Sequence, residues 1–364
     1  MKKLILIILI LGSCYNSSTN SKFIEEFISK NPLLLESLKK NEIQVKLTVI
    51  DENEIFSEYE YNIDEKKYFY PASTVKLPIA LLALEKLNEN KNISIDTPFM
   101  LEDDTLKTTI KKEIEKVFIL SDNQANNRLF EFLGQDYINK KLKSKGFKDS
   151  KIFHRLSTNN SSNLDGKVVN FFLEDSIVSF RNNNRNIQKL KIKNLKKGKG
   201  YIDSSGKLVL SQMDFSEKNY ISIADLHRVI KILFFPEKFK ESERFNLSEN
   251  QKQILFDYMS GYPIDFGYNS DDFPYYFGKF FIYGDQNLEF DENIKIYNKV
   301  GLAYGQLSDV AYIKSGDISF ILTATINVNT NKIYNDDEYD YDEIGFPFLA
   351  EISREILNRL SYKL

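Results

Sequence analysis

The chain has 364 residues, with 49 Lys or Arg against 52 Asp or Glu, so its formal net charge is −3. This balance lacks the strong basic excess that nucleic-acid binding requires. Two histidines and one cysteine argue against a structural zinc site, and a single cysteine excludes an intrachain disulfide. We therefore expect no metal and no cofactor.

The N-terminus has the pattern of a secretory signal. Lys2 and Lys3 precede an apolar run over residues 4–11, which is followed by Gly12-Ser13-Cys14. As a helix this run rises about 12 Å, too little to cross a hydrocarbon core of about 30 Å. We expect residues 1–13 to be a signal peptide, 14–22 a flexible polar tether, and 23–364 one folded domain.

Both ends of this domain contain strand patterns. After a helix-like segment over 23–38, apolar and polar residues alternate over 43–49, and residues 55–63 are expected to pair with them as a hairpin. Near the C-terminus we expect further strands and a final amphipathic helix. They cover residues 294–300, 307–314 and 318–328 for the strands and 345–361 for the helix.

The middle of the chain predicts mainly helices. A broadly apolar helix begins at Ser73, directly after a strand exit at Tyr70-Pro71-Ala72. The polar and uneven segment 155–220 includes a lysine-rich stretch over 189–199, interpreted as a solvated loop or hairpin. The aromatic residues of 275–281 could line the edge of a cleft, but core packing is the favoured interpretation. The further helices are predicted over 105–119, 123–133, 222–235 and 248–260, and the last opens with Ser248-Glu249-Asn250-Gln251, which fits a capping box.

These elements predict an α/β (α+β) fold with one antiparallel sheet assembled from both termini. The sheet part covers about 40–72 and 290–364, and a mainly helical part over about 73–289 is inserted between them.

Ser73-Thr74-Val75-Lys76 is a candidate catalytic tetrad. Residues three apart on a helix share a face, so the Lys76 amine can reach the Ser73 hydroxyl. A serine becomes a good nucleophile when a neighbouring base takes its proton, and a lysine is such a base when burial depresses its pKa. The tetrad alone is weak evidence, because the spacing recurs at Ser37/Lys40 and Ser204/Lys207.

Two more motifs follow along the chain. Ser121-Asp122-Asn123 lies at a corner between two predicted helices, where it could serve a cleft or simply cap a helix. Lys299-Val300-Gly301 ends a late strand, where lysine supplies a fixed charge and glycine allows close approach of the backbone.

The ordered set of motifs resembles the class A β-lactamases and, more broadly, the serine β-lactamases and penicillin-binding proteins. The resemblance covers about residues 40–364 and implies a β-lactamase/transpeptidase-like fold. It also implies roles for individual residues. Ser73 would be the acylated nucleophile, Lys76 its base and Ser121 a proton shuttle, with Asn123, Lys299, Gly301 and Leu302 binding substrate and the Ser73 and Leu302 N–H groups forming the oxyanion hole.

The chain departs from the class A pattern at two positions. Ser157 stands where the glutamate that activates the deacylating water is expected, and Val300 replaces the usual threonine or serine. We therefore expect efficient acylation and slow deacylation, or a substrate with its own acceptor. Glu174 and Asp175 could replace the glutamate only if their loop folds back.

The leading prediction is thus a serine hydrolase acting on a β-lactam or related amide. A penicillin-binding D,D-peptidase and a non-catalytic, lipid-anchored binding protein are the alternatives. Leu11-Gly12-Ser13-Cys14 resembles a lipobox, which implies export and anchoring through Cys14 to the bacterial cell envelope, at the periplasmic face or the cell surface. We also expect a monomer. His154 and His227 are interpreted as structural.

Overall fold

The computed structural model describes residues 22, 24–26, 41–90, 92–158, 161–184 and 189–362, and Asn183 through its backbone alone. The predicted signal peptide with Cys14, and nearly all of the predicted tether and first helix, lie outside these residues.

A five-stranded antiparallel sheet joins the two ends of the chain, in the order β11-β12-β13-β1-β2. Its N-terminal strand pairs with a C-terminal one, with Lys46 opposite Thr323, and β2 completes the predicted hairpin. This confirms the predicted fold class. The strands are β1 (Gln44–Ile50), β2 (Phe56–Tyr61), β11 (Ile294–Ala303), β12 (Gln306–Ser315) and β13 (Ile318–Asn327).

The middle of the chain supplies the larger helices, and side-chain caps fix where several of them begin. Ser248 and Gln251 form the predicted capping box of α8, and Ser222 caps α7 in the same position. The helices are α3 (Lys76–Leu87), α4 (Ile110–Ile119), α5 (Asn123–Leu133), α6 (Gln135–Ser144), α7 (Ile223–Phe234) and α8 (Glu249–Ser260).

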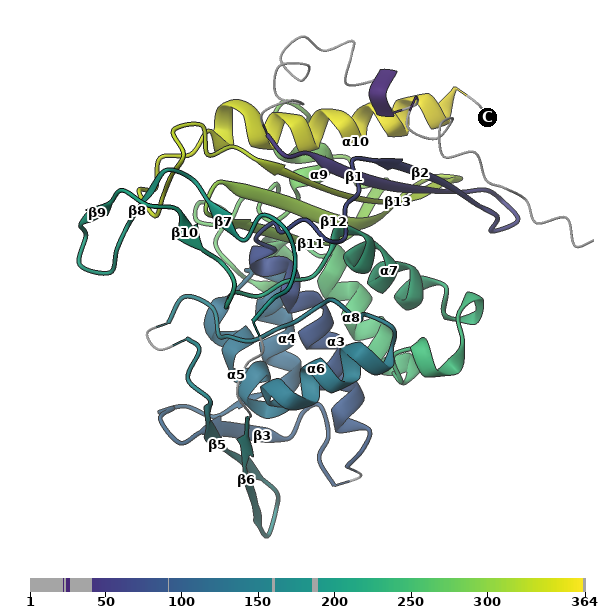
Figure 1. The fold of residues 1–364 in the computed structure, drawn as a ribbon. Coiled ribbons are helices and arrows are strands. Elements are labelled where there is room, and N and C mark those ends of the chain that lie inside the picture. Colours follow the sequence, from purple (N-terminus) through teal and green to yellow (C-terminus); the bar gives the residue numbers. More distant parts are fainter. Residues whose placement is uncertain are drawn as a thin grey trace, which may run out of the picture.

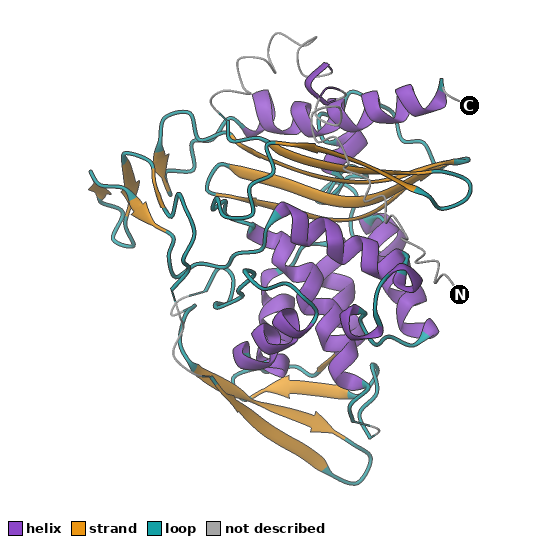
Figure 2. Ribbon diagram, turned by 45° about the vertical axis from the view of Figure 1, so that its right-hand side comes forward, coloured by secondary structure: helices purple, strands orange, loops and turns teal. Residues whose placement is uncertain are grey.

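The sheet lies between two helical layers (Figures 1 and 2). The C-terminal helix α10 (Phe346–Ser361), preceded by a π-helical turn over Tyr341–Gly345, covers one face together with the short α9 (Phe280–Tyr283). The helical part covers the other face, with α7 against β13 and α8 against β11. Each face has its own hydrophobic core, and the strands alternate side chains between them.

The helical part also contains a second sheet that the sequence did not predict. Four strands in the order β4-β3-β5-β6 form it, and its β5–β6 hairpin projects from the bottom of Figure 1. The predicted helix over 105–119 begins only at Ile110, because Thr109 is extended and accepts a hydrogen bond from the Lys112 N–H as its N-cap. The strands are β3 (Pro98–Leu101), β4 (Thr108–Thr109), β5 (Asp165–Phe172) and β6 (Ile177–Asn183).

The lysine-rich segment is not simply a solvated loop. Lys197 is buried, and its amine lies 2.6 Å from the Glu42 carboxylate, so the prediction of a solvated segment is wrong for this lysine, whereas the other lysines of 189–199 are exposed. Five short strands lie in this region, and β8 pairs with β14 from the C-terminal part. They are β7 (Lys196–Lys197), β8 (Gly200–Ile202), β9 (Leu208–Val209), β10 (Met213–Asp214) and β14 (Ile333–Tyr334).

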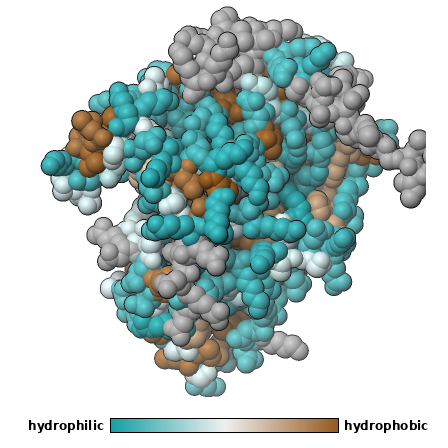
Figure 3. Space-filling model, in the orientation of Figure 1, coloured by the Kyte–Doolittle hydropathy of each residue, from teal (hydrophilic) through white to brown (hydrophobic). Residues whose placement is uncertain are grey.

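The face shown in Figure 3 is mostly hydrophilic, with a hydrophobic tip on the β8–β9 hairpin, where Leu208 and Leu210 are exposed. Within the described part of the chain, every helix is too short or too polar to span a membrane.

Candidate active site

Ser73 lies in a 3-10 turn (Ala72–Val75) that leads directly into α3. The residue before it, Ala72, has a positive φ of 46°, and the Thr74 hydroxyl donates to the Pro71 carbonyl at 2.6 Å. Residues 70 and 71 do not belong to a strand and Ala72 begins the 3-10 turn, so the prediction that a strand ends over 70–72 is wrong. Pro71 has no N–H and Ala72 is left-handed, so the chain turns sharply here and presents Ser73 half-buried at the start of the helix.

Lys76 is fully buried under the α4–α5 corner. Its amine donates to the Ser121 carbonyl, to the Asn123 Oδ1 at 2.7 Å and, more weakly, to the Ser121 hydroxyl at 3.4 Å. Burial, reinforced by the positive charge of Lys299, holds the pKa of Lys76 well below its usual range. A neutral amine that can accept a proton is therefore favoured at this position.

Ser121 occupies a strained corner between α4 and α5, with φ of 53°. Non-glycine residues are uncommon in this conformation, and it turns the Ser121 hydroxyl toward both site lysines. The next residue, Asp122, is the N-cap of α5 and accepts a hydrogen bond from the Ala125 N–H at 2.6 Å. Within the Ser-Asp-Asn motif, Ser121 therefore lines a cavity, whereas Asp122 caps a helix.

Lys299 reaches Ser121 from the opposite side, from β11. Its amine donates to the Ser121 hydroxyl at 2.7 Å and to the Val300 carbonyl at 3.1 Å, and burial lowers its pKa to about 7. Two residues on, Gly301 lies against the 3-10 turn. A Cβ at Gly301 would lie 2.6 Å from the Pro71 carbonyl oxygen and 3.1 Å from the Ser73 nitrogen, so only glycine permits this approach.

Ser73 and Ser121 line one cavity of about 330 Å³. Leu302, whose N–H was predicted to bind substrate, lines it as well. The structure thus brings together here the 3-10 turn, the α4–α5 corner, β11, α9 with the loops beside it, and the start of α10. Tyr276 and Phe277 of the loop before α9 and Phe280 of α9 contribute to the lining, so the cleft-edge alternative holds for them, whereas Phe281 is fully buried in the core.

Asn123 is engaged at both ends of its amide. Its Oδ1 accepts from Lys76, and its Nδ2 donates to the Ser157 hydroxyl at 2.9 Å. Ser157 thus lies next to the site, as its place in the sequence predicted. Its positive φ of 46° marks a tight turn after Arg155.

Arg155 anchors this turn and is itself buried against the Glu131 carboxylate. The carbonyl of Asn163 accepts from the Arg155 guanidinium at 2.8 Å. The proposed substitutes for the missing glutamate do not reach the site. Glu174 and Asp175 are exposed at the tip of the β5–β6 hairpin, away from the sheet and β11 (Figure 1).

Both histidines are buried outside the Ser73 cavity. His227 bridges the hydroxyls of Thr48 at 2.7 Å and Thr323 at 3.0 Å, and burial holds its pKa well below the usual range. The Nδ1 of His154 lies 2.6 Å from the Arg155 carbonyl oxygen, and burial lowers the pKa of His154 to about 4. Neither ring forms a triad with Ser73.

A buried charge network behind β11 was missed by sequence reasoning. The Lys279 amine donates to the Met259 and Ile296 carbonyls and to Asn298 Oδ1, at 2.7, 3.0 and 2.9 Å. Asn298 in turn donates to Asp309 Oδ1 at 2.9 Å. A lone lysine inside the aromatic run and a lone aspartate inside the apolar strand β12 were the available signals.

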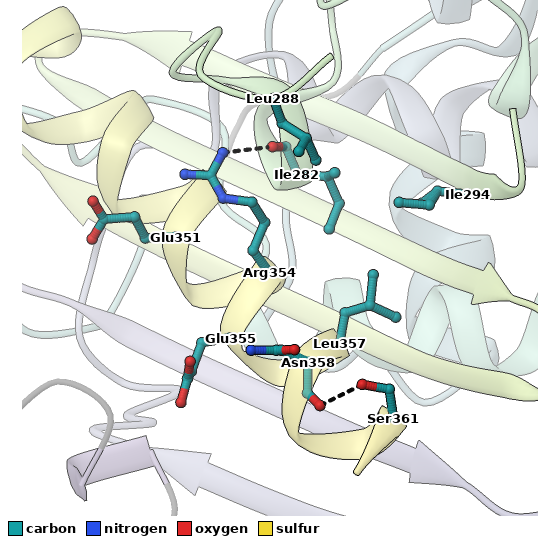
Figure 4. Close-up of a pocket in the computed structure, with 9 residues that line it drawn as sticks. All are labelled: Ile282, Leu288, Ile294, Glu351, Arg354, Glu355, Leu357, Asn358 and Ser361. Atoms are coloured by element: carbon teal, nitrogen blue, oxygen red, sulfur yellow. Dashed lines mark hydrogen bonds between the residues drawn. The ribbon is translucent and has the colours of Figure 1, made fainter. Parts of the chain in front are cut away.

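Other cavities lie away from these residues. A cavity of about 500 Å³ lies between α10, which contributes Arg354 and Leu357, and the residues Ile282, Leu288 and Ile294, and it contains none of the predicted site residues (Figure 4). Among the described residues, no group of three or more His, Cys, Asp or Glu side chains is placed to hold a metal ion.

The model of the beta-lactamase enzyme family matches residues 33–360. The structure is similar to that of the TLA-3 extended-spectrum beta-lactamase at 15% identity and a TM-score of 0.56, covering 94% of this chain and 99% of that one. It is also similar to a class A beta-lactamase from Bacteroides cellulosilyticus DSM 14838, at 15% identity and a TM-score of 0.54, covering 93% and 97%. A beta-lactamase from Sphaerobacter thermophilus DSM 20745 gives 12% identity and a TM-score of 0.52, covering 92% and 96%.

At these identities the solved structures show the fold alone, and no curated protein matches the chain in sequence. The family match spans nearly the whole described region and includes every residue of the site built above. The chain therefore belongs to the beta-lactamase enzyme family and is a β-lactamase-like serine hydrolase.

Proposed function

We propose that the protein cleaves a β-lactam or related amide through an acyl-enzyme on Ser73, and that this intermediate is released slowly. The observation that carries the proposal is the convergence of Lys76 and Lys299 on Ser121, in a cavity that Ser73 also lines. Two buried amines and a hydroxyl beside a half-buried serine can move a proton from nucleophile to leaving group.

In acylation, Lys76 takes the Ser73 proton as the oxygen attacks the amide carbon. Lys299 donates a hydrogen bond to the Ser121 oxygen, so the Ser121 proton is directed to the leaving nitrogen. The close contact of Gly301 with the Ser73 nitrogen supports an oxyanion site formed by the Ser73 and Leu302 N–H groups.

In deacylation, a water molecule must lose a proton as it attacks the acyl ester. Ser157 has a hydroxyl where a carboxylate would act, and this hydroxyl already accepts a hydrogen bond from Asn123. A serine hydroxyl is not a base at neutral pH, so we expect the acyl-enzyme to accumulate.

Covalent labelling by a fluorescent penicillin tests the nucleophile. We expect one equivalent of label on the wild-type protein and none on Ser73→Ala, with Thr74→Ser as a control that keeps the hydroxyl bonded to Pro71. Label retained in Ser73→Ala would refute the assignment.

A penicillin-binding D,D-peptidase is the second candidate, because slow deacylation suits a peptide acceptor. Release of D-alanine from a cell-wall peptide would favour it.

We also propose that Cys14 carries a lipid that anchors the protein to the cell envelope, on the strength of the Leu11-Gly12-Ser13-Cys14 pattern. Metabolic labelling with an alkyne fatty acid tests this, since the wild-type chain should be labelled and Cys14→Ser should not.

A further inference from the structure

We propose that this site selects neutral substrates whose leaving-group side is apolar, rather than substrates that carry a carboxylate there. The inference rests on the proposed acyl-enzyme and names the class of molecule that forms it. It comes from the walls of the Ser73 cavity on the side of Ser121 and Lys299.

The first observation is the chemistry of these walls. None of the side chains lining the cavity carries a charge. The lining is dominated by aromatic and aliphatic groups, namely Tyr276, Phe277, Phe280, Val300, Leu302 and Phe346. A carboxylate placed among them would lose its hydration without gaining an ionic partner in the wall, whereas an alkyl or aryl group would be stabilised by leaving water.

The second observation concerns Lys299, whose amine is bonded to two residues of this wall, Ser121 and Val300. Its side chain is only 2% exposed, and its amine is already bonded to the Ser121 hydroxyl and the Val300 carbonyl. Val300 provides no hydroxyl that could hold a carboxylate beside it. Lys299 is therefore placed to act on Ser121 rather than to bind an anion in the cavity.

The third observation is that the aromatic wall is held in place. The Phe281 N–H donates to Asp309 Oδ2 at 3.1 Å, and the Ile282 N–H donates to the Ser353 hydroxyl at 2.7 Å. Arg354 on α10 donates to the Ile282 carbonyl at 3.0 Å, as Figure 4 shows. These contacts stabilise Ile282 at φ of 69°, a costly conformation for a β-branched residue, and so fix the loop that carries the wall.

The chemical step is the same for an amide or an ester of this class. The Ser73 oxygen forms a bond to the carbonyl carbon, the bond from that carbon to the leaving nitrogen or oxygen breaks, and the Ser73 proton passes through Lys76 and Ser121 to the leaving atom. Water then returns a proton to Ser73 and a hydroxyl to the acyl carbon.

A matched substrate pair tests the inference. The probes are a chromogenic cephalosporin with its free carboxylate, its methyl ester and its benzyl ester, and the measurement is the acylation rate constant from ring opening. We expect the methyl ester to acylate Ser73 at least tenfold faster than the acid. The benzyl ester should acylate Ser73 faster than the methyl ester. The expected gain in rate is about fourfold for each additional carbon atom that becomes buried in the cavity.

Phe277→Arg places a cation in the wall and should shift the ester-to-acid ratio at least tenfold toward the acid. Leu210→Arg, the same kind of change at an exposed leucine of the β8–β9 hairpin, should leave the ratio unchanged. A faster reaction with the acid in the wild-type protein would overturn the inference, as would an unchanged ratio in folded Phe277→Arg. Absence of any adduct on Ser73 with all three probes would instead overturn the proposed function.

Discussion

At Lys76, burial and a neighbouring charge act on the pKa in the same direction. The side chain is removed from water, and Lys299 adds a second positive charge across Ser121, so both disfavour the ammonium form. The opposing attraction of Asp122 is the smallest of the three effects. Lys76 therefore has the environment of a base, while Lys299, with a pKa of about 7, changes charge near neutrality.

Removing the charge of Lys299 should move the acid limb of the pH–rate profile. In Lys299→Met the pKa of Lys76 rises, because a like charge is lost, so the base stays protonated to higher pH and acylation requires a more alkaline solution. Measurement of the acylation rate constant from pH 5 to 9 should show this displacement. Lys299→Arg keeps a positive charge and should leave the limb near its wild-type position, whereas equal limbs in Met and Arg variants would contradict the account.

The Ser157 position offers a direct test of the slow step. Ser157→Glu places a carboxylate within reach of Asn123, and we expect deacylation to accelerate by about 10²-fold, the lower range for a positioned general base. Ser157→Gln has nearly the same size and no basic group, so it serves as the matched control. Single-turnover decay of the acyl-enzyme measures both, and equal decay in the two variants would show that the missing carboxylate does not limit turnover.

At the scale of elements, the site depends on how closely β11 approaches the 3-10 turn before α3. Gly301→Ala puts a Cβ into the Pro71 carbonyl and should separate the two elements. We expect a loss of about 1–3 kcal/mol in the free energy of unfolding and a fall of at least about 10²-fold in acylation. Acylation and denaturant unfolding, measured on the same preparation, give the two values.

Gly316→Ala is the control for this prediction. Gly316 has φ of 57° in the β12–β13 turn with no atom within 4 Å of its Cβ position, so alanine costs about 1 kcal/mol of backbone strain there. We expect a comparable loss of stability with no loss of acylation. If Gly301→Ala acylates as fast as Gly316→Ala, the close approach has no role in the site.

The elements also show what the sequence could predict. Alternation over 43–49 predicted β1, the strands predicted over 294–300 and 307–314 lie within a few residues of β11 and β12, and the Ser248/Gln251 pair marked the start of α8. Short strands such as β3 and β4 depend on pairing with other segments, which leaves little local pattern. The same holds for Lys197, because its partner Glu42 is far away in the sequence. The Ser121 conformation and the apolar cavity wall are likewise products of tertiary packing.

At the scale of the whole molecule, buried charges link the active-site sheet to both helical layers. Lys279 contacts α8 through the Met259 carbonyl and β11 through Asn298, and Asp309 accepts a hydrogen bond from the Phe281 N–H of α9. Burial lowers the pKa of Lys279 to about 7 and raises that of Asp309 to about 6. Such a network costs free energy of desolvation but fixes the geometry of the groups that it joins.

This network predicts a pH dependence of stability. Between its folded pKa of about 7 and its ordinary value of 10.5, Lys279 binds fewer protons in the native state than in the unfolded state. The free energy of unfolding therefore rises with pH across this window. In Lys279→Met this part of the rise should disappear, whereas Lys295→Met, at an exposed lysine of β11, should keep the wild-type slope. Urea denaturation at pH 7 to 9.5 measures the slopes, and identical slopes in all three proteins would contradict the lowered pKa of the buried Lys279.

The central claim is that Ser73 is acylated quickly and released slowly. Stopped-flow mixing of the enzyme with a chromogenic cephalosporin, with mass spectrometry of samples quenched on the same time scale, tests it most directly. The account predicts a burst of about one equivalent, an acyl adduct on the peptide that contains Ser73, and slow turnover afterwards. Rapid turnover that is linear from the first point, with no adduct at Ser73, would contradict it.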